Sequence, residues 1–140
     1  MFTRFLGITG LSSFIASQVG AADIGYYELM LIICLVYLAL GMVMEPFGAM
    51  LVTLPVFIPL LDAQGVSLVW FGVFVVKLLE IGMITPPVGL NVFVIRNVAS
   101  EHVRTLQIFA GVAPFFVADL VVVGLLIAFP AIALTLPALL

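Results

Sequence analysis

The sequence contains very little charge. Of its 140 residues only 8% are Asp, Glu, Lys or Arg, whereas a soluble domain carries about a quarter. Hydrophobic residues make up 66% of the chain, and the mean hydropathy is +1.46. So few charged side chains cannot cover a surface that faces water, and the composition therefore predicts an integral membrane protein.

Cysteine and histidine are nearly absent as well. Cys34 is the single cysteine, which excludes an intramolecular disulfide and a cysteine-based metal site. His102 is the single histidine, and it stands in a polar segment where we expect it to be solvated.

The net charge of −3 excludes a basic nucleic-acid binder. No nucleophile–base combination is present, so we expect neither an enzyme nor a cofactor.

Long apolar runs make up most of the sequence. Three hydrophobic blocks follow the first twenty residues, enough for about three to five crossings of a bilayer core roughly 30 Å thick. We therefore expect an all-α integral membrane fold, a multi-helix bundle forming one membrane domain over residues 1–140. The expected segments are a partial re-entrant hairpin (1–20), a broken helix (26–61), a second broken helix (66–95), a polar loop with an interfacial helix (96–112) and a final transmembrane helix (113–136).

The first of these segments leaves an alternative open, and segment 96–112 bears on the orientation in the membrane. Met1–Gly20 has a hydroxyl-rich turn that includes Ser12 and Ser13, which suits half of a re-entrant hairpin with a polar tip, but an interfacial helix fits the same residues. Its interrupted apolar run is not typical of a signal peptide. Segment 96–112 holds Arg96 and Arg104, two of the four basic residues, and the positive-inside rule favours the cytoplasmic side for it.

The strongest local signal is the run ITPPVGLN at residues 84–91. Pro86 and Pro87 have no N–H groups, so a helix here would leave the carbonyls of Gly82 and Met83 without partners. Thr85 precedes a proline and is biased away from helical torsion angles. In hydrocarbon, open backbone survives only where protein buries it or where it lines a polar cavity. A purposeful helix break and a simple proline kink are the two readings.

A second run repeats the same form. Gly41–Gly48 and Gly82–Gly89 both read Gly-Met-(Val/Ile)-x-x-Pro-x-Gly. We expect a helix interruption in each, with the two interruptions lying near each other. Unwound carbonyls and the C-terminal ends of half-helices coordinate small cations. Oxygen ligands without Cys or His clusters suit an alkali cation better than a transition metal.

Charges inside the apolar blocks are few. Lys77 and Glu80 are three residues apart on one helix face and can form an ion pair. Charged groups at this depth usually face a bundle interior, and a structural ion pair that holds helices in register is the simplest interpretation. Asp119 stands near one end of the final apolar block.

The run from Glu80 to Val94, EIGMITPPVGLNVFV, resembles the C-terminal signature of the large membrane subunit of tripartite ATP-independent periplasmic (TRAP) transporters, the DctM-like dicarboxylate permeases. The resemblance extends over essentially the whole chain, through GMVMEP at 41–46, TLPVFIP at 53–59 and VAPFF at 112–116. It covers only about the last third of that subunit, the end of the second inverted repeat of an ion-transporter-type fold. Met1–Gly20 resembles the later half of that repeat's hairpin.

This resemblance implies a part of a sodium-coupled secondary transporter that imports an organic acid, such as a C4-dicarboxylate, across the bacterial inner membrane. The implied partners are a small membrane subunit, a periplasmic binding protein and the remainder of the permease. Two alternatives stay open at this point. One is a broken-helix transporter of another sodium/anion family, and the other is a small membrane scaffold or partner subunit without transport activity.

The resemblance also implies a site. Sodium, the coupling ion, would be bound mostly by backbone carbonyls at both interruptions. Glu45 is either a charge behind these carbonyls or a residue at the protein–water boundary. Substrate would be bound by four polar side chains, with the Thr85 hydroxyl common to both sets. The sodium ligands expected are Gly41, Met42, Gly82, Met83, Ile84 and Thr85. The substrate-binding residues expected are Thr85, Asn91, Ser12 and Ser13, with bracing of the helix break as the alternative role for Asn91.

Overall fold

The computed structural model describes residues 10, 24–99, 103–135 and 137–139, and in these residues it contains helices and no strand. The expectation of an all-helical fold is confirmed. The helices are α3 (Tyr26–Val43), α4 (Pro46–Ala63), α5 (Leu68–Ile84), α6 (Leu90–Val98), α7 (Thr105–Ala128) and α8 (Ala131–Leu134), followed by a 3-10 turn η1 (Pro137–Leu139). The partial hairpin expected over 1–20 lies outside the described residues.

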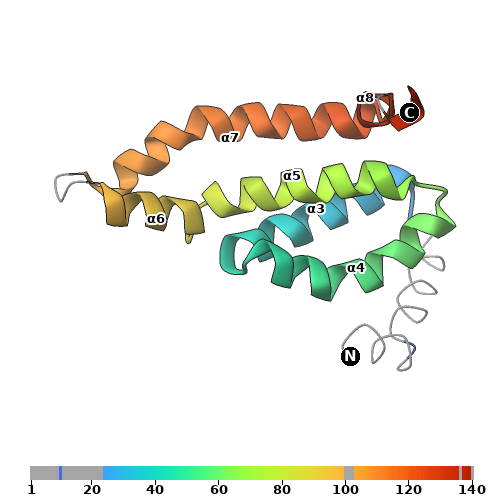
Figure 1. Ribbon diagram of the computed structural model, residues 1–140, viewed down its shortest axis with the longest axis horizontal. Coiled ribbons are helices and arrows are strands. Elements are labelled where there is room, and N and C mark those ends of the chain that lie inside the picture. Colours follow the sequence, from blue (N-terminus) through green and yellow to red (C-terminus); the bar gives the residue numbers. More distant parts are fainter. Residues whose placement is uncertain (1–9, 11–23, 100–102, 136, 140) are drawn as a thin grey trace.

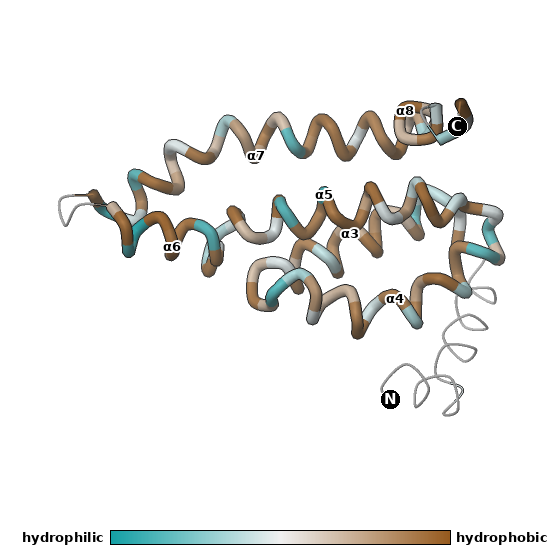
Figure 2. The backbone as a smooth tube through the Cα atoms, in the orientation of Figure 1, coloured by the Kyte–Doolittle hydropathy of each residue, from teal (hydrophilic) through white to brown (hydrophobic). Residues whose placement is uncertain are grey.

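Within the part of the chain that the structure describes, three helices, α3, α4 and α7, are long and apolar enough to cross a membrane. Most residues of these helices are hydrophobic, as the largely brown colour of their backbone in Figure 2 shows. A helix that is apolar all round belongs in a protein core or in lipid. Many large apolar side chains on these helices are exposed, among them Leu31, Leu35 and Phe115. The chain is therefore a membrane protein, and these side chains suit lipid or a partner helix.

Helix α5 is the centre of the fold. It packs against α3, α4, α6, α7 and α8, and Trp70, Phe71, Phe74, Val75 and Leu78 on its inner faces are buried. Figure 1 shows α3 and α5 running in the same direction, with α4 and α7 antiparallel to them. Because the apolar core is built around α5, the packing of that helix fixes the position of the residues at its C-terminal end.

The first interruption reverses the chain. Helices α3 and α4 lie antiparallel on either side of it (Figure 1), and a buried contact joins them where the Thr53 hydroxyl lies 2.6 Å from the Tyr37 hydroxyl and 2.8 Å from the Ala49 carbonyl. Since Thr53 has one proton, it donates to Ala49 and accepts from Tyr37. The structure thus has a two-helix hairpin where the sequence suggested one broken helix over 26–61.

The C-terminal boundaries also differ from those expected. Helix α7 runs without a break through 105–112 and ends at Ala128, whereas we expected an interfacial helix before residue 113 and a crossing up to 136. Pro130 has no N–H for the carbonyl of Leu126, and the Trp70 indole N–H donates to that carbonyl instead, at 3.0 Å. The proline thus ends α7 and allows α5 to bind there.

Candidate functional site

Both predicted interruptions are present. Helix α3 ends at Val43 and α4 begins at Pro46, and helix α5 ends at Ile84 and α6 begins at Leu90. Pro46 has no N–H to donate to the carbonyl of Met42, and Pro87 has none for the carbonyl of Met83. The prolines therefore leave strong acceptors without helical partners, as expected from the sequence.

The two interruptions lie against each other. Helices α3 and α5 cross at Gly41 and Gly82, where a Cβ atom added to Gly82 would lie only 2.6 Å from the Cα atom of Gly41. The same residue of each Gly-Met-x-x-x-Pro-x-Gly run makes this backbone contact. Since α3 and α5 run in the same direction (Figure 1), both helices present their C-terminal ends at this place.

Thr85 stands at the end of α5. Its N–H donates to the Gly82 carbonyl at 3.1 Å and closes a tight final turn of the helix. The Gly82 carbonyl, one of the six expected sodium ligands, therefore already accepts one hydrogen bond. Its hydroxyl donates to the Ile81 carbonyl at 2.6 Å. A hydroxyl has one proton and two lone pairs, so the Thr85 oxygen keeps acceptor capacity for a cation. Thr85 is half-buried, as are Met83 and Ile84 beside it.

Gly89 controls the step from the second interruption into α6. Its φ of +58° is in the left-handed region, where a side chain is unfavourable. A Cβ atom there would also lie 3.1 Å from the ring of Phe109 on α7. A cavity of about 210 Å³ separates the interruption from α7, lined by Ile84, Pro86, Phe109, Val112, Ala113 and Phe116. The glycine thus lets α6 continue beside α7.

Glu45 has a local role at the first interruption. Its carboxylate accepts the N–H groups of Phe47 at 3.0 Å and Gly48 at 3.1 Å, and so caps the N-terminus of α4. The side chain is exposed. The carboxylate stands at the positive end of the helix dipole, where negative charge is favourable. The interruption thus has a carboxylate beside it, but one that already has two donors.

The remaining predicted substrate residues are less constrained. Asn91 is exposed in the first turn of α6, and no hydrogen bond links its side chain to another residue in the described ranges. Ser12 and Ser13 lie outside the described residues. Within the ranges that the structure describes, no group of three or more His, Cys, Asp or Glu residues could hold a metal ion.

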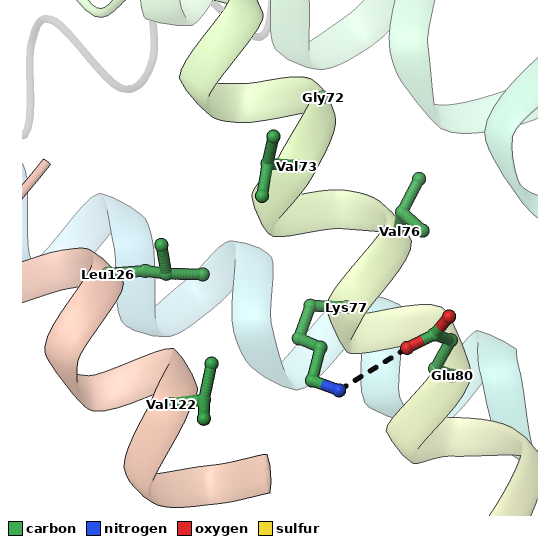
Figure 3. Close-up of a pocket in the computed structure, with 7 residues that line it drawn as sticks. All are labelled: Gly72, Val73, Val76, Lys77, Glu80, Val122 and Leu126. Atoms are coloured by element: carbon green, nitrogen blue, oxygen red, sulfur yellow. Dashed lines mark hydrogen bonds and ion pairs between the residues drawn. The ribbon is translucent and has the colours of Figure 1, made fainter. Parts of the chain in front are cut away.

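The predicted ion pair has a third member. Lys77 Nζ lies 3.3 Å from Glu80 Oε2, as expected, and 2.8 Å from Asp119 Oδ1 on α7. We did not predict the contact with Asp119 from the sequence. The separation of residues 77 and 119 along the chain does not indicate that α5 and α7 pack antiparallel. The available signal was that each of these apolar blocks carries charge at membrane depth. Figure 3 shows Lys77 and Glu80 at a groove between α5 and α7.

Comparison with known proteins places these features in a family. The family model described as "Tripartite ATP-independent periplasmic transporter, DctM component" matches residues 1–132. The chain belongs to this family of TRAP transporter large permeases. The resemblance inferred from the run EIGMITPPVGLNVFV is confirmed, and the family is one of transport proteins rather than enzymes.

Individual TRAP large permeases agree with this assignment. The chain is 29% identical over its full length to the C4-dicarboxylate TRAP transporter large permease DctM of Rhodobacter capsulatus, and 31% identical over 98% of its length to the DctM permease of Pseudomonas aeruginosa. It is 36% identical over 78% of its length to the sialic acid TRAP transporter large permease SiaM of Vibrio cholerae. The chain spans 25 to 32% of the length of these relatives.

Proposed function

We propose that this chain provides one sodium site and part of the substrate path of a sodium-coupled importer of an organic acid. The relatives' names include a C4-dicarboxylate and sialic acid, which supports an organic acid without choosing one. The complete transporter would contain the remainder of the permease, a small membrane subunit and a periplasmic substrate-binding protein, and would act at the bacterial inner membrane.

The contact between Gly41 and Gly82 carries the proposal. It brings together the C-terminal ends of α3 and α5, each of which carries roughly half a negative charge from aligned peptide dipoles. Met42 and Met83, whose carbonyls lack the N–H of the fourth following residue, are adjacent to the two glycines. Convergent negative dipole ends with open carbonyls form an environment suited to a small cation such as sodium.

The proposed ligands are the carbonyls of Gly41, Met42, Gly82, Met83 and Ile84, together with Thr85. The Gly82 carbonyl already accepts the N–H of Thr85 and would use its second lone pair. Asn91 lies at the start of α6, where the helix dipole is positive and favours a substrate carboxylate. We retain Ser12 and Ser13 as further substrate contacts on the basis of their hydroxyl groups.

The test uses a complete permease that carries this segment, assembled with its small subunit and binding protein in liposomes. Thr85→Val removes the hydroxyl at nearly constant volume, and Thr85→Ser retains it. We expect the sodium concentration for half-maximal uptake to rise roughly tenfold in T85V, which corresponds to about 1.4 kcal/mol, and to change little in T85S.

Two results would contradict the proposal at different levels. Equal sodium dependence in T85V and the unaltered protein would exclude the hydroxyl as a ligand while leaving the carbonyls. Uptake that proceeds at the same rate without a sodium gradient would exclude sodium coupling altogether.

A further inference from the structure

One strip of α5 is not covered by the rest of the chain. Its inner faces pack against the neighbouring helices, but Val69, Gly72, Val73, Val76 and Glu80 are exposed; we call these five residues the α5 strip. Figure 3 shows Val73 on the side of α5 that faces Leu126 and Val122 of α7, whereas Val76 projects from the other side of α5. A groove of about 480 Å³ lies between the two helices.

The spacing of the strip is that of a helix-packing seam. Val69, Val73, Val76 and Glu80 follow one another at intervals of four, three and four residues, the alternation that keeps side chains facing a partner helix. Gly72 lies in the strip with nothing within 4 Å of an added Cβ atom, and small residues let membrane helices approach closely. A second cavity of about 280 Å³, lined in part by Val76 and Glu80, continues the surface toward α4.

The charge at the strip is not balanced. Lys77 contacts two carboxylates, Glu80 at 3.3 Å and Asp119 at 2.8 Å, which leaves a net charge of −1 among the three. The shorter contact is to Asp119. Glu80 has 54% of its side chain exposed, and within the described residues its Oε1 atom accepts no hydrogen bond. Glu80 lies in the C-terminal half of α5, four residues before the helix ends, and an unbalanced carboxylate in apolar surroundings is unfavourable.

We propose that the α5 strip is the docking surface for one transmembrane helix of another polypeptide segment, and that this helix carries a Lys or Arg opposite Glu80. The apolar groove receives the body of the helix, Gly72 allows close approach, and the basic side chain balances the remaining negative charge. Bound organic acid is disfavoured here, because the groove already carries the same sign of charge as the substrate.

A second copy of this chain is a poorer occupant. A parallel symmetric contact through the α5 strip would place Glu80 opposite Glu80, and like charges in a low-dielectric interface repel each other. The Lys77 of a second copy would already be shared between two carboxylates. The charge of the strip therefore favours a basic helix.

The experiment uses the purified chain in liposomes of neutral phosphatidylcholine. A photo-reactive residue replaces Val76 in the strip, and the matched control places it at Leu35, which is exposed on α3 outside the groove. The probes are three labelled Leu/Ala helices of about twenty residues that differ only at the central position, which is Lys, norleucine or Glu.

We expect the Lys probe to cross-link at position 76 about threefold or more above the norleucine probe, with no preference at position 35. Glu80→Gln should abolish the preference, and Glu80→Lys should transfer it to the Glu probe. Glu28→Gln, the same charge change at an exposed residue on α3, should leave it intact. Circular dichroism checks that each variant is helical, and E80Q alone suffices if E80K does not fold.

Three results would overturn the proposal. One is an equal yield for all probes at position 76, which would leave lipid as the occupant. Another is a preference for Lys that persists in E80Q. The third is cross-linking of the chain to itself in place of the probes, which would assign the strip to a second copy. None of these measurements involves sodium or uptake, so the outcome is independent of the proposed transport function.

Discussion

Gly41 and Gly82 contact each other through their backbones. An added Cβ atom at Gly41 would lie 3.0 Å from the Cα atom of Gly82, and the reciprocal distance is 2.6 Å. The first residues of two similar sequence runs, forty-one positions apart, are therefore the point where α3 and α5 cross. This contact sets the distance between the two helix interruptions, and with it the geometry of the proposed sodium site.

Gly82→Ala should destabilise the chain. A methyl group at 2.6 Å from backbone must push α3 and α5 apart, and overpacking of this kind costs about 1–3 kcal/mol, more than the gain of up to about 1 kcal/mol from alanine's helix propensity. The measurement is unfolding in detergent, followed by circular dichroism. Gly72→Ala on the same helix, with open space around its Cβ position, is the control and should be neutral or slightly stabilising. Equal stability of the two variants would mean that the crossing is not tightly packed.

The ion pair between Lys77 and Asp119 should couple α5 to α7. A double-mutant cycle with Lys77→Met and Asp119→Asn should give an interaction free energy of about 1–3 kcal/mol, because the two side chains are largely buried and are 2.8 Å apart. The parallel cycle with Glu80→Gln should give less, about 0.5 kcal/mol, since Glu80 is more exposed and farther from Lys77. A larger interaction free energy in the Glu80 cycle would mean that Glu80, and not Asp119, is the stronger partner of Lys77.

Substitutions of Glu45 should separate its capping role from its charge. Glu45→Ala removes both and should destabilise the α3–α4 hairpin by about 1 kcal/mol. Glu45→Ser supplies a standard cap without charge and should restore most of that stability. Comparing sodium dependence of uptake between E45S and the unaltered permease then reports on the charge alone. If E45A is as stable as E45S, the hydrogen bonds to Phe47 and Gly48 contribute nothing measurable.

The purified chain alone in liposomes should show no sodium-driven uptake of organic acids. Alternating access in broken-helix transporters uses two repeats that move against each other, and the chain spans 25 to 32% of the length of the relatives compared above. Uptake is measured with radiolabelled substrate under an imposed sodium gradient, with the complete assembly as the positive control. Robust uptake by the chain alone would show that several copies form a complete site.

The sequence by itself determined the class of the protein and the two places, after Val43 and after Ile84, where a helix is interrupted. Scarce charge and long apolar runs require lipid, and Pro46, Pro86 and Pro87 lack the N–H groups that a continuing helix needs. The prediction that the two interruptions lie near each other followed from the pattern shared by Gly41–Gly48 and Gly82–Gly89. The family could also be recognised from contiguous residues, because the run from Glu80 to Val94 is a local pattern.

Tertiary structure decided where the chain goes after each interruption and which distant groups meet. A missing N–H ends a helix without setting the direction of the next one, so the reversal at Glu45 and the continuation past Gly89 were not readable from the prolines. The contact of Lys77 with Asp119 depends on the antiparallel packing of α5 and α7. Such contacts arise from the fit of whole helix surfaces, and short-range sequence patterns carry no record of that fit.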